Sequence, residues 1–304
     1  MSESSSSASG DASAQIASHR TVHLDGPGGG HDLVIRPLES ADDYARGESL
    51  QRATWGDGHD FDEITSATMM LISQKVGGIA AGAFDEEGTL RGFVFGLTGL
   101  KDGRPTHWSH MLAVDPPYGG YGLGRQLKSY QRDQLLALGV ERMLWTYDPL
   151  VARNAHLNLN RLGAEPIEYH VNLYGEGDKN ALHRGLGTDR FVVEWRLDSA
   201  AVDQALRRNA LFVDGNRLAD APRVNSDDQG RPRTDDFPLP DAPVLRIEVP
   251  YDVQTLKTDD PDQARDWRTA TRRAFVDTMG RGYRIRSLVR DGGRCYYVLE
   301  APAS

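Results

Sequence analysis

The amino-acid sequence predicts an α+β protein in which helices flank a mixed, mostly antiparallel sheet. Two patterns in the 304 residues favour this class. Apolar residues recur at every second position in several short segments and at about every 3.6 positions in others, which is typical of strands and of amphipathic helices. Two predicted helices come first, and three predicted strands follow with only short turns between them, so these strands are expected to pair as an antiparallel meander.

The composition divides the chain into four parts. Residues 1–30 combine a Ser run with a Gly cluster and cannot bury enough apolar surface to offset their ordering entropy, so we interpret them as a disordered tail. The patterned residues 31–198 form the main domain. Residues 199–240 begin as a short helix and then become rich in Asp, Arg and Pro, which indicates a linker or arm. Residues 241–304 form a small C-terminal extension with the order β-α-β-β.

Each element is placed by its apolar period and by the residues that end it. Ser40 and Asp43 form a capping-box-like pair at a helix start, and Gly139 and Gly163 stand where helix C-terminal caps are expected. In the main domain these signals predict strands over residues 33–35, 79–84, 90–97, 107–114, 142–147, 167–173 and 191–197. They predict helices over residues 40–55, 62–75, 123–138 and 155–162. In the extension they predict strands over residues 244–249, 284–290 and 295–300, and a helix over residues 261–279.

Composition excludes several classes of function. The chain has 35 Lys and Arg against 44 Asp and Glu, and this net charge of -9 opposes unspecific attraction to nucleic acid or anionic lipid. No apolar stretch approaches the length of a membrane-spanning helix. Cys295, the single cysteine, excludes an internal disulfide and a CxxC zinc site. We therefore expect a cytoplasmic protein with no metal, no nucleic-acid partner and no membrane partner.

The sharpest motif is a glycine-rich turn between a predicted strand and a predicted helix. Glycines stand at positions 119, 120, 122 and 124, and the helix begins at once. Closely spaced glycines let backbone N–H groups converge, and the helix start adds its own unpaired donors and positive dipole end. Arg125 and Lys128 could add positive charge from the first turns of the helix. The motif therefore indicates a phosphate or pyrophosphate site.

Three other interpretations of this turn are possible. The glycines could simply make a tight corner. A dinucleotide site, as in a nicotinamide-dependent oxidoreductase, needs G-x-G-x-x-G within parallel strands, whereas this chain has G-x-G-x-G after a meander. A nucleotide-binding P-loop needs G-x-x-x-x-G-K-S/T, and the sequence contains no such string.

The motif resembles the acyl-CoA-binding motif of the GNAT acyltransferase superfamily, through Val114-Asp-Pro followed by Gly122-x-Gly124. The order of elements between His31 and Leu197 is also similar to the GNAT fold. A closer likeness is to a bacterial branch of predicted N-acetyltransferases that shares the C-terminal extension. It rests on the strings over residues 109–112, 145–149, 153–160, 162–164, 188–195 and 267–268.

The resemblance implies an enzyme that transfers an acyl group from acetyl-CoA, or another acyl-CoA, to an amine of a small molecule by direct attack. It also implies that the strand before the glycines and the strand after the next helix splay apart. Residues of the first strand would then hold the pantetheine arm, amides of the turn would hold the pyrophosphate, and an Asn would lie beside CoA. The expected cofactor-binding residues are Leu112, Ala113, Val114, Gly119, Gly120, Tyr121, Gly122, Leu123, Gly124, Arg125 and Asn154.

The catalytic candidates are His110, Glu194 and Tyr147. The incoming amine must be neutral, so a base is needed, and His110 is expected to share a strand face with Leu112 and Val114. Ser109 would then point to the other face, unless a bulge reverses this. A histidine packed in the core or in a dimer interface is the alternative for His110, and a solvated carboxylate is the alternative for Glu194.

Two departures from the superfamily pattern support a second hypothesis. Gly119 stands where a Gln or Arg is usual, and Leu159 stands where a Tyr often protonates the departing thiolate. Tyr118, Tyr121 or Tyr147 could replace that acid, or the chain could be an acyl-CoA-binding protein or an enzyme with other thioester chemistry.

Arg268 and Arg272 lie one helical turn apart and indicate either an anion clamp or an exposed ion-pair face, of which we favour the second. A homodimer is left open.

Overall fold

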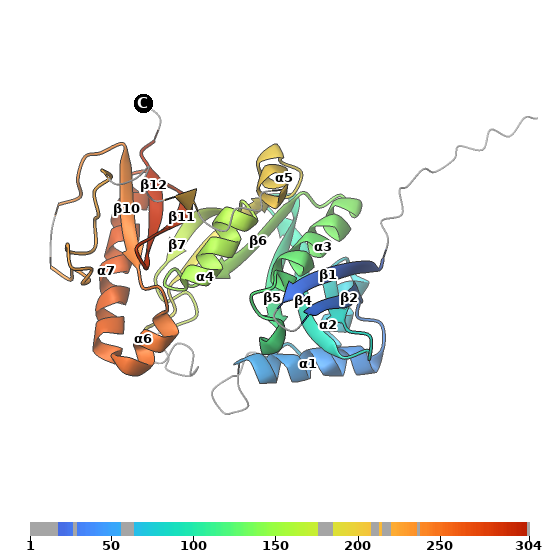
Figure 1. Cartoon of the computed structure of the whole chain (residues 1–304). Coiled ribbons are helices and arrows are strands. Elements are labelled where there is room, and N and C mark those ends of the chain that lie inside the picture. Colours follow the sequence, from blue (N-terminus) through green and yellow to red (C-terminus); the bar gives the residue numbers. More distant parts are fainter. Residues whose placement is uncertain are drawn as a thin grey trace, which may run out of the picture.

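The computed structural model describes residues 18–26, 29–55, 64–175, 185–207, 213–214, 220–235 and 238–302. Two sheets organise the described chain (Figure 1): an eight-stranded sheet in the order β1-β2-β3-β4-β5-β6-β8-β7 and a four-stranded sheet in the order β10-β12-β11-β9. All neighbouring strands in these two sheets run antiparallel except β5 with β6 and β11 with β9. The predicted α+β class is therefore confirmed.

The large sheet consists of β1 (Arg20–Gly26), β2 (Gly29–Pro37), β3 (Ile79–Phe84), β4 (Leu90–Lys101), β5 (Arg104–Val114), β6 (Arg142–Tyr147), β7 (Glu165–His170) and β8 (Arg190–Arg196). Its helices are α1 (Ala41–Trp55), α2 (Ala67–Lys75), the short 3-10 helix η1 (Pro116–Tyr118), α3 (Leu123–Ala137), α4 (Ala152–Ala155), the π-helical segment η2 (His156–Arg161) and α5 (Ala200–Arg207). The C-terminal unit contains β9 (Val213–Asp214), β10 (Val244–Val249), α6 (Val253–Asp259), α7 (Pro261–Gly280), β11 (Arg284–Asp291) and β12 (Arg294–Glu300).

The strand β1 corrects the prediction that residues 1–30 form a disordered tail. It pairs with β2 along its whole length and buries Val22 and Leu24. Arg20 also forms an ion pair with Asp133 of α3, 2.5 Å apart. Two alternating apolar residues were too short a signal beside the Ser and Gly clusters, and their burial depends on the partner strand. Residues 1–17 lie outside the described part of the chain.

Other boundaries differ from the predictions for local reasons. The strands predicted to end at residue 97 and to begin at residue 107 continue to a two-residue turn, in which Asp102 and Gly103 adopt positive φ angles of 55° and 72°. The second helix begins at Ala67 instead of residue 62, because the Ser66 hydroxyl accepts a hydrogen bond from the Met69 amide and caps it. The helix α6 was missed, although Asp252 caps it in the same way.

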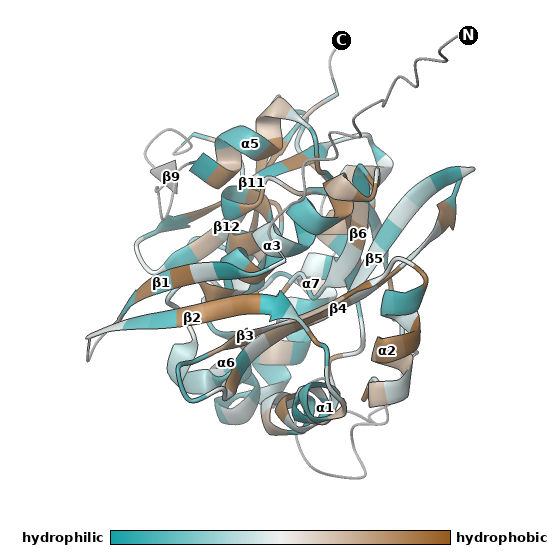
Figure 2. Cartoon of the chain, turned by 90° about the vertical axis from the view of Figure 1, so that its right-hand side faces the viewer, coloured by the Kyte–Doolittle hydropathy of each residue, from teal (hydrophilic) through white to brown (hydrophobic). Residues whose placement is uncertain are grey.

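Helices cover both faces of the large sheet (Figure 2). On one face α1 and α2 enclose a cluster that includes Phe93 and Phe95 of β4. On the other face α3 contributes Leu123 and Leu127 to a second cluster, which also contains Val94. Alternate residues of β4 therefore serve the two cores, as the period of two predicts.

The C-terminal unit shares this second core with the sheet. Phe191 of β8 packs edge-on against Phe275 of α7, with ring centroids 4.7 Å apart, and Phe275 packs against Tyr297 of β12 at 5.1 Å. The Asn160 side chain of η2 accepts from the Leu288 amide and donates to the Leu288 carbonyl. The predicted β-α-β-β order is present, and its elements stand against the β7 and η2 end of the sheet (Figure 1).

Arg268 and Arg272 fasten α7 to the large sheet. Arg268 pairs with Asp148 at 2.6 Å, and its side chain is only 4% exposed. Arg272 donates both Nε and Nη2 to the carboxylate of Asp189 at 2.8 Å. The prediction that these arginines form ion pairs is correct. The prediction that they lie on an exposed face is wrong, because their acidic partners belong to the large-sheet domain and α7 packs against it.

Candidate active site

The strands β5 and β6 separate in the middle of the large sheet. Their parallel ladder contains only the pairs His107 with Met143 and Trp108 with Leu144. Beyond these pairs, residues 109–114 of β5 and 145–147 of β6 have no ladder partner across the gap, as far as the described residues extend. Each strand is paired on its other edge, with β4 and β8 respectively. The two facing edges therefore carry backbone groups that can bind a ligand, and the splayed strands implied by the GNAT resemblance are present.

The glycine turn closes one end of this gap. Gly120 and Gly122 adopt φ angles of 87° and 89°, and a Cβ at either position would meet no described atom within 4 Å. Gly122 also occupies the N-cap of α3 without a side-chain cap, so the amides of the first turn lack a side-chain acceptor. The turn thus presents backbone donors and the positive end of a 15-residue helix to open space, which suits a phosphate group.

The predicted pantetheine residues divide between the two faces of β5. Leu112 and Val114 lie under the turn, where a Cβ on Gly124 would sit 3.7 Å from Leu112 and 3.9 Å from Val114. Ala113 is buried in the opposite core, beneath α1 and α2. Any contact of Ala113 with a cofactor would therefore be made by its backbone.

Arg125 turns away from the glycine turn. Its Nη2 donates a hydrogen bond to the Leu206 carbonyl of α5, and its pKa is lowered by burial and by the charge of Arg161. Tyr121 and Asn154 are half-buried, the first against the core of α3 and the second on α4. The expected phosphate contacts at Gly119 to Gly124 are thus those of the backbone.

His110 is the extra residue of a β-bulge. Phe95 pairs with Met111 and Gly96 pairs with Ser109, so one β4 step spans two residues of β5. The bulge turns Ser109 toward α3, on the face of Leu112 and Val114, whereas His110 is exposed with its ring 6.2 Å from Phe95. The expectation that His110 shares the face of Leu112 is therefore wrong for the reason named with it, because a bulge reverses the alternation.

The side chains of the other two catalytic candidates are engaged with neighbouring residues. Glu194 is opposite Leu144 and pairs with Arg142, which also reaches Asp102 in the β4–β5 turn. Tyr147 is buried, with its ring 5.5 Å from Phe191, and burial raises the pKa of its hydroxyl. The raised pKa makes Tyr147 a weak proton donor, and the ion pair with Arg142 engages the Glu194 carboxylate.

A buried polar chain beneath the gap was not foreseen. Lys128 Nζ donates to Ser109 Oγ at 2.6 Å, and Ser109 donates to Gln131 Oε1 at 3.0 Å. Gln131 Nε2 then reaches His107 Nε2 at 3.0 Å, while His107 Nδ1 lies 2.9 Å from Thr98 Oγ1. Lys128 was expected to face a phosphate, but its position on α3 next to Leu127 directs it at the sheet. Two polar pairs in the sequence could have indicated this chain. His107 and Ser109 are alternate residues of one strand, and Lys128 and Gln131 are one turn apart on the following helix.

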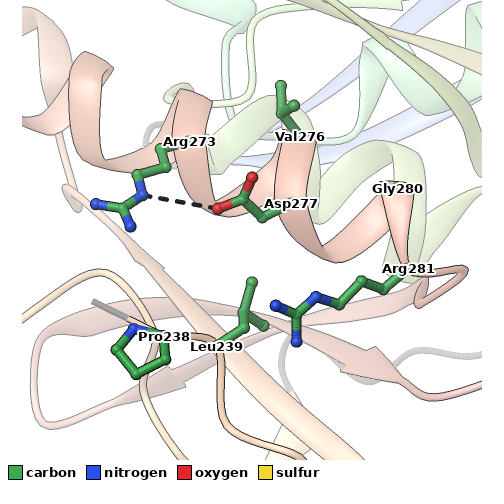
Figure 3. A pocket seen from close by; sticks show the side chains of 7 residues that line it. All are labelled: Pro238, Leu239, Arg273, Val276, Asp277, Gly280 and Arg281. Atoms are coloured by element: carbon green, nitrogen blue, oxygen red, sulfur yellow. Dashed lines mark ion pairs between the residues drawn. The ribbon is translucent and has the colours of Figure 1, made fainter. Parts of the chain in front are cut away.

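Two of the hollows in the described part of the chain lie outside this gap, at the C-terminal unit. One lies on the C-terminal unit, where Arg281 of the α7 end and Leu239 face each other across it and Arg273 pairs with Asp277 (Figure 3). The other, of about 450 Å³, lies between α4 and the C-terminal unit. Its lining residues are Val151, Ala152, Arg153, His156, Tyr251, Asp252, Val253, Gln254, Leu288 and Cys295.

The described residues contain no group of three or more His, Cys, Asp or Glu side chains able to hold a metal ion. Among the described helices none is long and apolar enough to cross a membrane.

The chain resembles solved acetyltransferase structures over about half its length. One is the ribosomal-protein-S18-alanine N-acetyltransferase from Escherichia coli, with 19% identity, a TM-score of 0.43 and coverage of 55% of this chain and 96% of that chain. Another is Naa50 from Arabidopsis thaliana in complex with the bisubstrate analogue CoA-Ac-MVNAL, with 15% identity, a TM-score of 0.42 and coverage of 53% and 97%. A third is an N-acetyltransferase from Staphylococcus aureus Mu50, with 13% identity, a TM-score of 0.42 and coverage of 55% and 99%. No protein-family profile matches the chain. No curated protein matches it.

Proposed function

We propose that this protein is an N-acyltransferase of the GNAT superfamily that uses acetyl-CoA, or another acyl-CoA, to acylate an amine. The observation that carries the proposal is the gap between β5 and β6, which ends at the open glycine turn. The turn offers uncharged N–H donors and a helix N-terminus to the pyrophosphate. The gap offers the unpaired strand edges of residues 109–114 to the pantetheine arm.

In this proposal the chemistry takes place at the bulge of β5. The amine nitrogen attacks the thioester carbonyl carbon, the C–N bond forms and the C–S bond breaks. His110, exposed at the bulge, accepts the proton that the amine loses. Backbone N–H groups at the splayed edge stabilise the negative charge that develops on the carbonyl oxygen.

We propose that the acceptor is a small-molecule amine. A hollow of about 450 Å³ beside α4 has the volume of a small-molecule pocket, which supports this size class. The acidic chain, with its net charge of -9, favours a cationic acceptor.

Calorimetry with acetyl-CoA tests the binding half of the proposal, and release of CoA thiol with a panel of small amines tests the reaction. We expect binding and amine-dependent thiol release. Absence of both heat and a thermal shift at millimolar acetyl-CoA would refute the proposal.

A second possible function is acyl-CoA binding at the same site without acyl transfer to an amine. Leu159 is buried, and the raised pKa of Tyr147 leaves that residue a weak acid, which favours an acyl-CoA-binding protein or other thioester chemistry. Binding of acetyl-CoA without thiol release from any amine would support this alternative.

The homodimer and the cytoplasmic location stay predictions. Exposed apolar side chains stand at Met69 and Ile72 of α2 and at Val76, which follows the helix, and this face is the one we propose for a second copy. Light scattering after size exclusion, with Val76→Lys as the variant, measures the oligomeric state.

A further inference from the structure

Lys128 lies at the point where β5 and β6 separate. Trp108 and Leu144 form the last ladder pair, so Ser109 and Trp145 are the first residues beyond it. The Lys128 Nζ atom contacts both of them, 2.6 Å from Ser109 Oγ and 4.0 Å from the centroid of the Trp145 ring. Its ammonium group therefore bridges the two strands at the apex of the gap.

The side chain of Lys128 is 3% exposed, and no ion pair joins it to a carboxylate of the described residues. Around it stand Ser109 on β5, Met143 and Trp145 on β6, and Gln131 on its own helix. His107 is the titratable group whose pKa its charge affects, and burial with that charge lowers the pKa of His107 to about 3. A buried ammonium without a counter-charge is costly unless another group uses its charge.

The hydrogen-bond chain beside Lys128 runs in one direction. Thr98 Oγ1 donates to the Gly77 carbonyl, so it accepts from His107 Nδ1, and His107 Nε2 then accepts from Gln131. Gln131 in turn accepts from Ser109, and Ser109 accepts from Lys128. Each hydroxyl and amide of this hydrogen-bond chain thereby has a hydrogen-bond partner. The hydrogen bonds hold Lys128 in place but provide no negative charge to pair with it.

The length of the gap brings a ligand's sulfur to this apex. Residues 109–114 lie opposite Gly96 to Gly92 of β4, so with the bulge they span four strand steps, about 13 Å at about 3.3 Å per step. This run leads from the glycine turn to Ser109, and an extended pantetheine arm has a similar length. With the pyrophosphate on the turn, the thioester end lies near Ser109 and Trp145.

We propose that the Lys128 ammonium stabilises the departing thiolate of CoA and returns a proton to it. This inference rests on the proposed function, because it requires CoA in the gap. When the C–S bond breaks, its electron pair stays on sulfur, and one Lys128 N–H proton moves to that sulfur. Neutral Lys128 then takes a proton from water. Burial lowers the pKa of Lys128 to about 7, so the proton can leave near neutral pH.

The test measures the ionisation of the CoA thiol when CoA is bound, by thiolate ultraviolet absorbance between pH 5 and pH 9. Burial raises the pKa of Cys295, the single cysteine, to about 11, so the change in this range comes from CoA. We expect Lys128→Met to decrease the acid dissociation constant of the bound thiol tenfold or more. Lys128→Arg keeps the positive charge, so the acid dissociation constant of the bound thiol should stay close to the wild-type value. Lys75→Met, which removes an exposed lysine of α2, is the matched control.

Desulfo-CoA separates this inference from the proposed function. It lacks the sulfur, so we expect the wild type and Lys128→Met to bind it within twofold of each other. Equal thiol ionisation in the two proteins would overturn the role of Lys128 alone. Failure of the wild type to bind either CoA or desulfo-CoA would overturn the role of Lys128 together with the site. If Lys128→Met does not fold, Lys128→Arg decides the inference. The pKa of the CoA thiol bound to Lys128→Arg must then be equal to or lower than that of the thiol bound to the wild type.

Discussion

Lys128 and His110 show how single residues acquire their chemistry from one strand irregularity. The bulge at His110 places Ser109 on the face of α3, where the Lys128 ammonium meets it. The same bulge leaves His110 exposed on the other side of β5. A candidate base and a buried cation therefore stand on opposite sides of the strand that leads to the proposed acyl-CoA site.

The charge on Lys128 makes stability depend on pH. Its pKa is about 10.5 in an unfolded chain and about 7 in the fold, so the unfolded state binds more protons between these values. We expect Lys128→Met to increase the free energy of unfolding by a few kcal/mol at pH 6, at about 1.4 kcal/mol per pKa unit. The gain should shrink as pH rises from 7 toward 10. Urea denaturation across this range measures it, and a gain independent of pH would show that Lys128 is not a buried titrating group.

His110 is expected to limit the reaction and not the binding of acetyl-CoA. With an amine that gives thiol release, His110→Gln should lower kcat/KM by about a hundredfold or more, since the base is lost. Calorimetry should give an unchanged affinity for acetyl-CoA, because the side chain faces away from Leu112 and Val114. Full activity of His110→Gln would assign the base to another residue.

At the scale of elements, the site is the junction of β5, the glycine turn and α3. The turn must adopt left-handed backbone at Gly120 and Gly122 to leave the first amides of α3 uncovered. The short ladder between β5 and β6 opens the gap that these amides face. The element arrangement thus supports the proposed anion site, in which backbone amides are the donors.

Gly122→Val tests this arrangement against a matched glycine. Gly122 and Gly139, at opposite ends of α3, have φ angles of 89° and 72°, and a Cβ at either would meet no described atom within 4 Å. Both Val variants should lose about 1–3 kcal/mol of stability through backbone strain. Only Gly122→Val should weaken acetyl-CoA binding, by tenfold or more in calorimetry. Equal affinities in the two variants would place the pyrophosphate elsewhere.

At the scale of the whole molecule, the C-terminal unit is fastened to the strand that lines the gap. Asp148 follows β6 directly and holds Arg268 of α7, and the aromatic rings of Phe191, Phe275 and Tyr297 continue this contact into one core. The position of the β6 end therefore depends on the C-terminal unit.

Arg268→Met should destabilise the protein by about 3 kcal/mol, because it leaves the buried Asp148 carboxylate with only the more distant Arg190, 3.9 Å away. Arg265→Met on the exposed face of the same helix breaks the pair with Asp262 and should cost at most about 0.5 kcal/mol. Thermal unfolding compares the two variants. In the wild type the Asp148 pKa is lowered, so its contribution is present above pH 4 and is lost as pH falls further. A loss in Arg268→Met no larger than in Arg265→Met would refute the structural role of the pair.

The local elements and the glycine turn could be predicted from the amino-acid sequence, because apolar period, caps and glycine positions act over a few residues. The α+β class, the strands over residues 79–84 and 142–147 and the start of α3 followed from these signals. The contacts between side chains could not be predicted, because they depend on how distant segments pack. The burial of Lys128, the bulge at His110, the partners of Arg268 and the strand at residues 20–26 each depend on a segment distant in sequence. A one-residue change of register or a partner on another element reverses the surroundings of a side chain, and no local pattern encodes it.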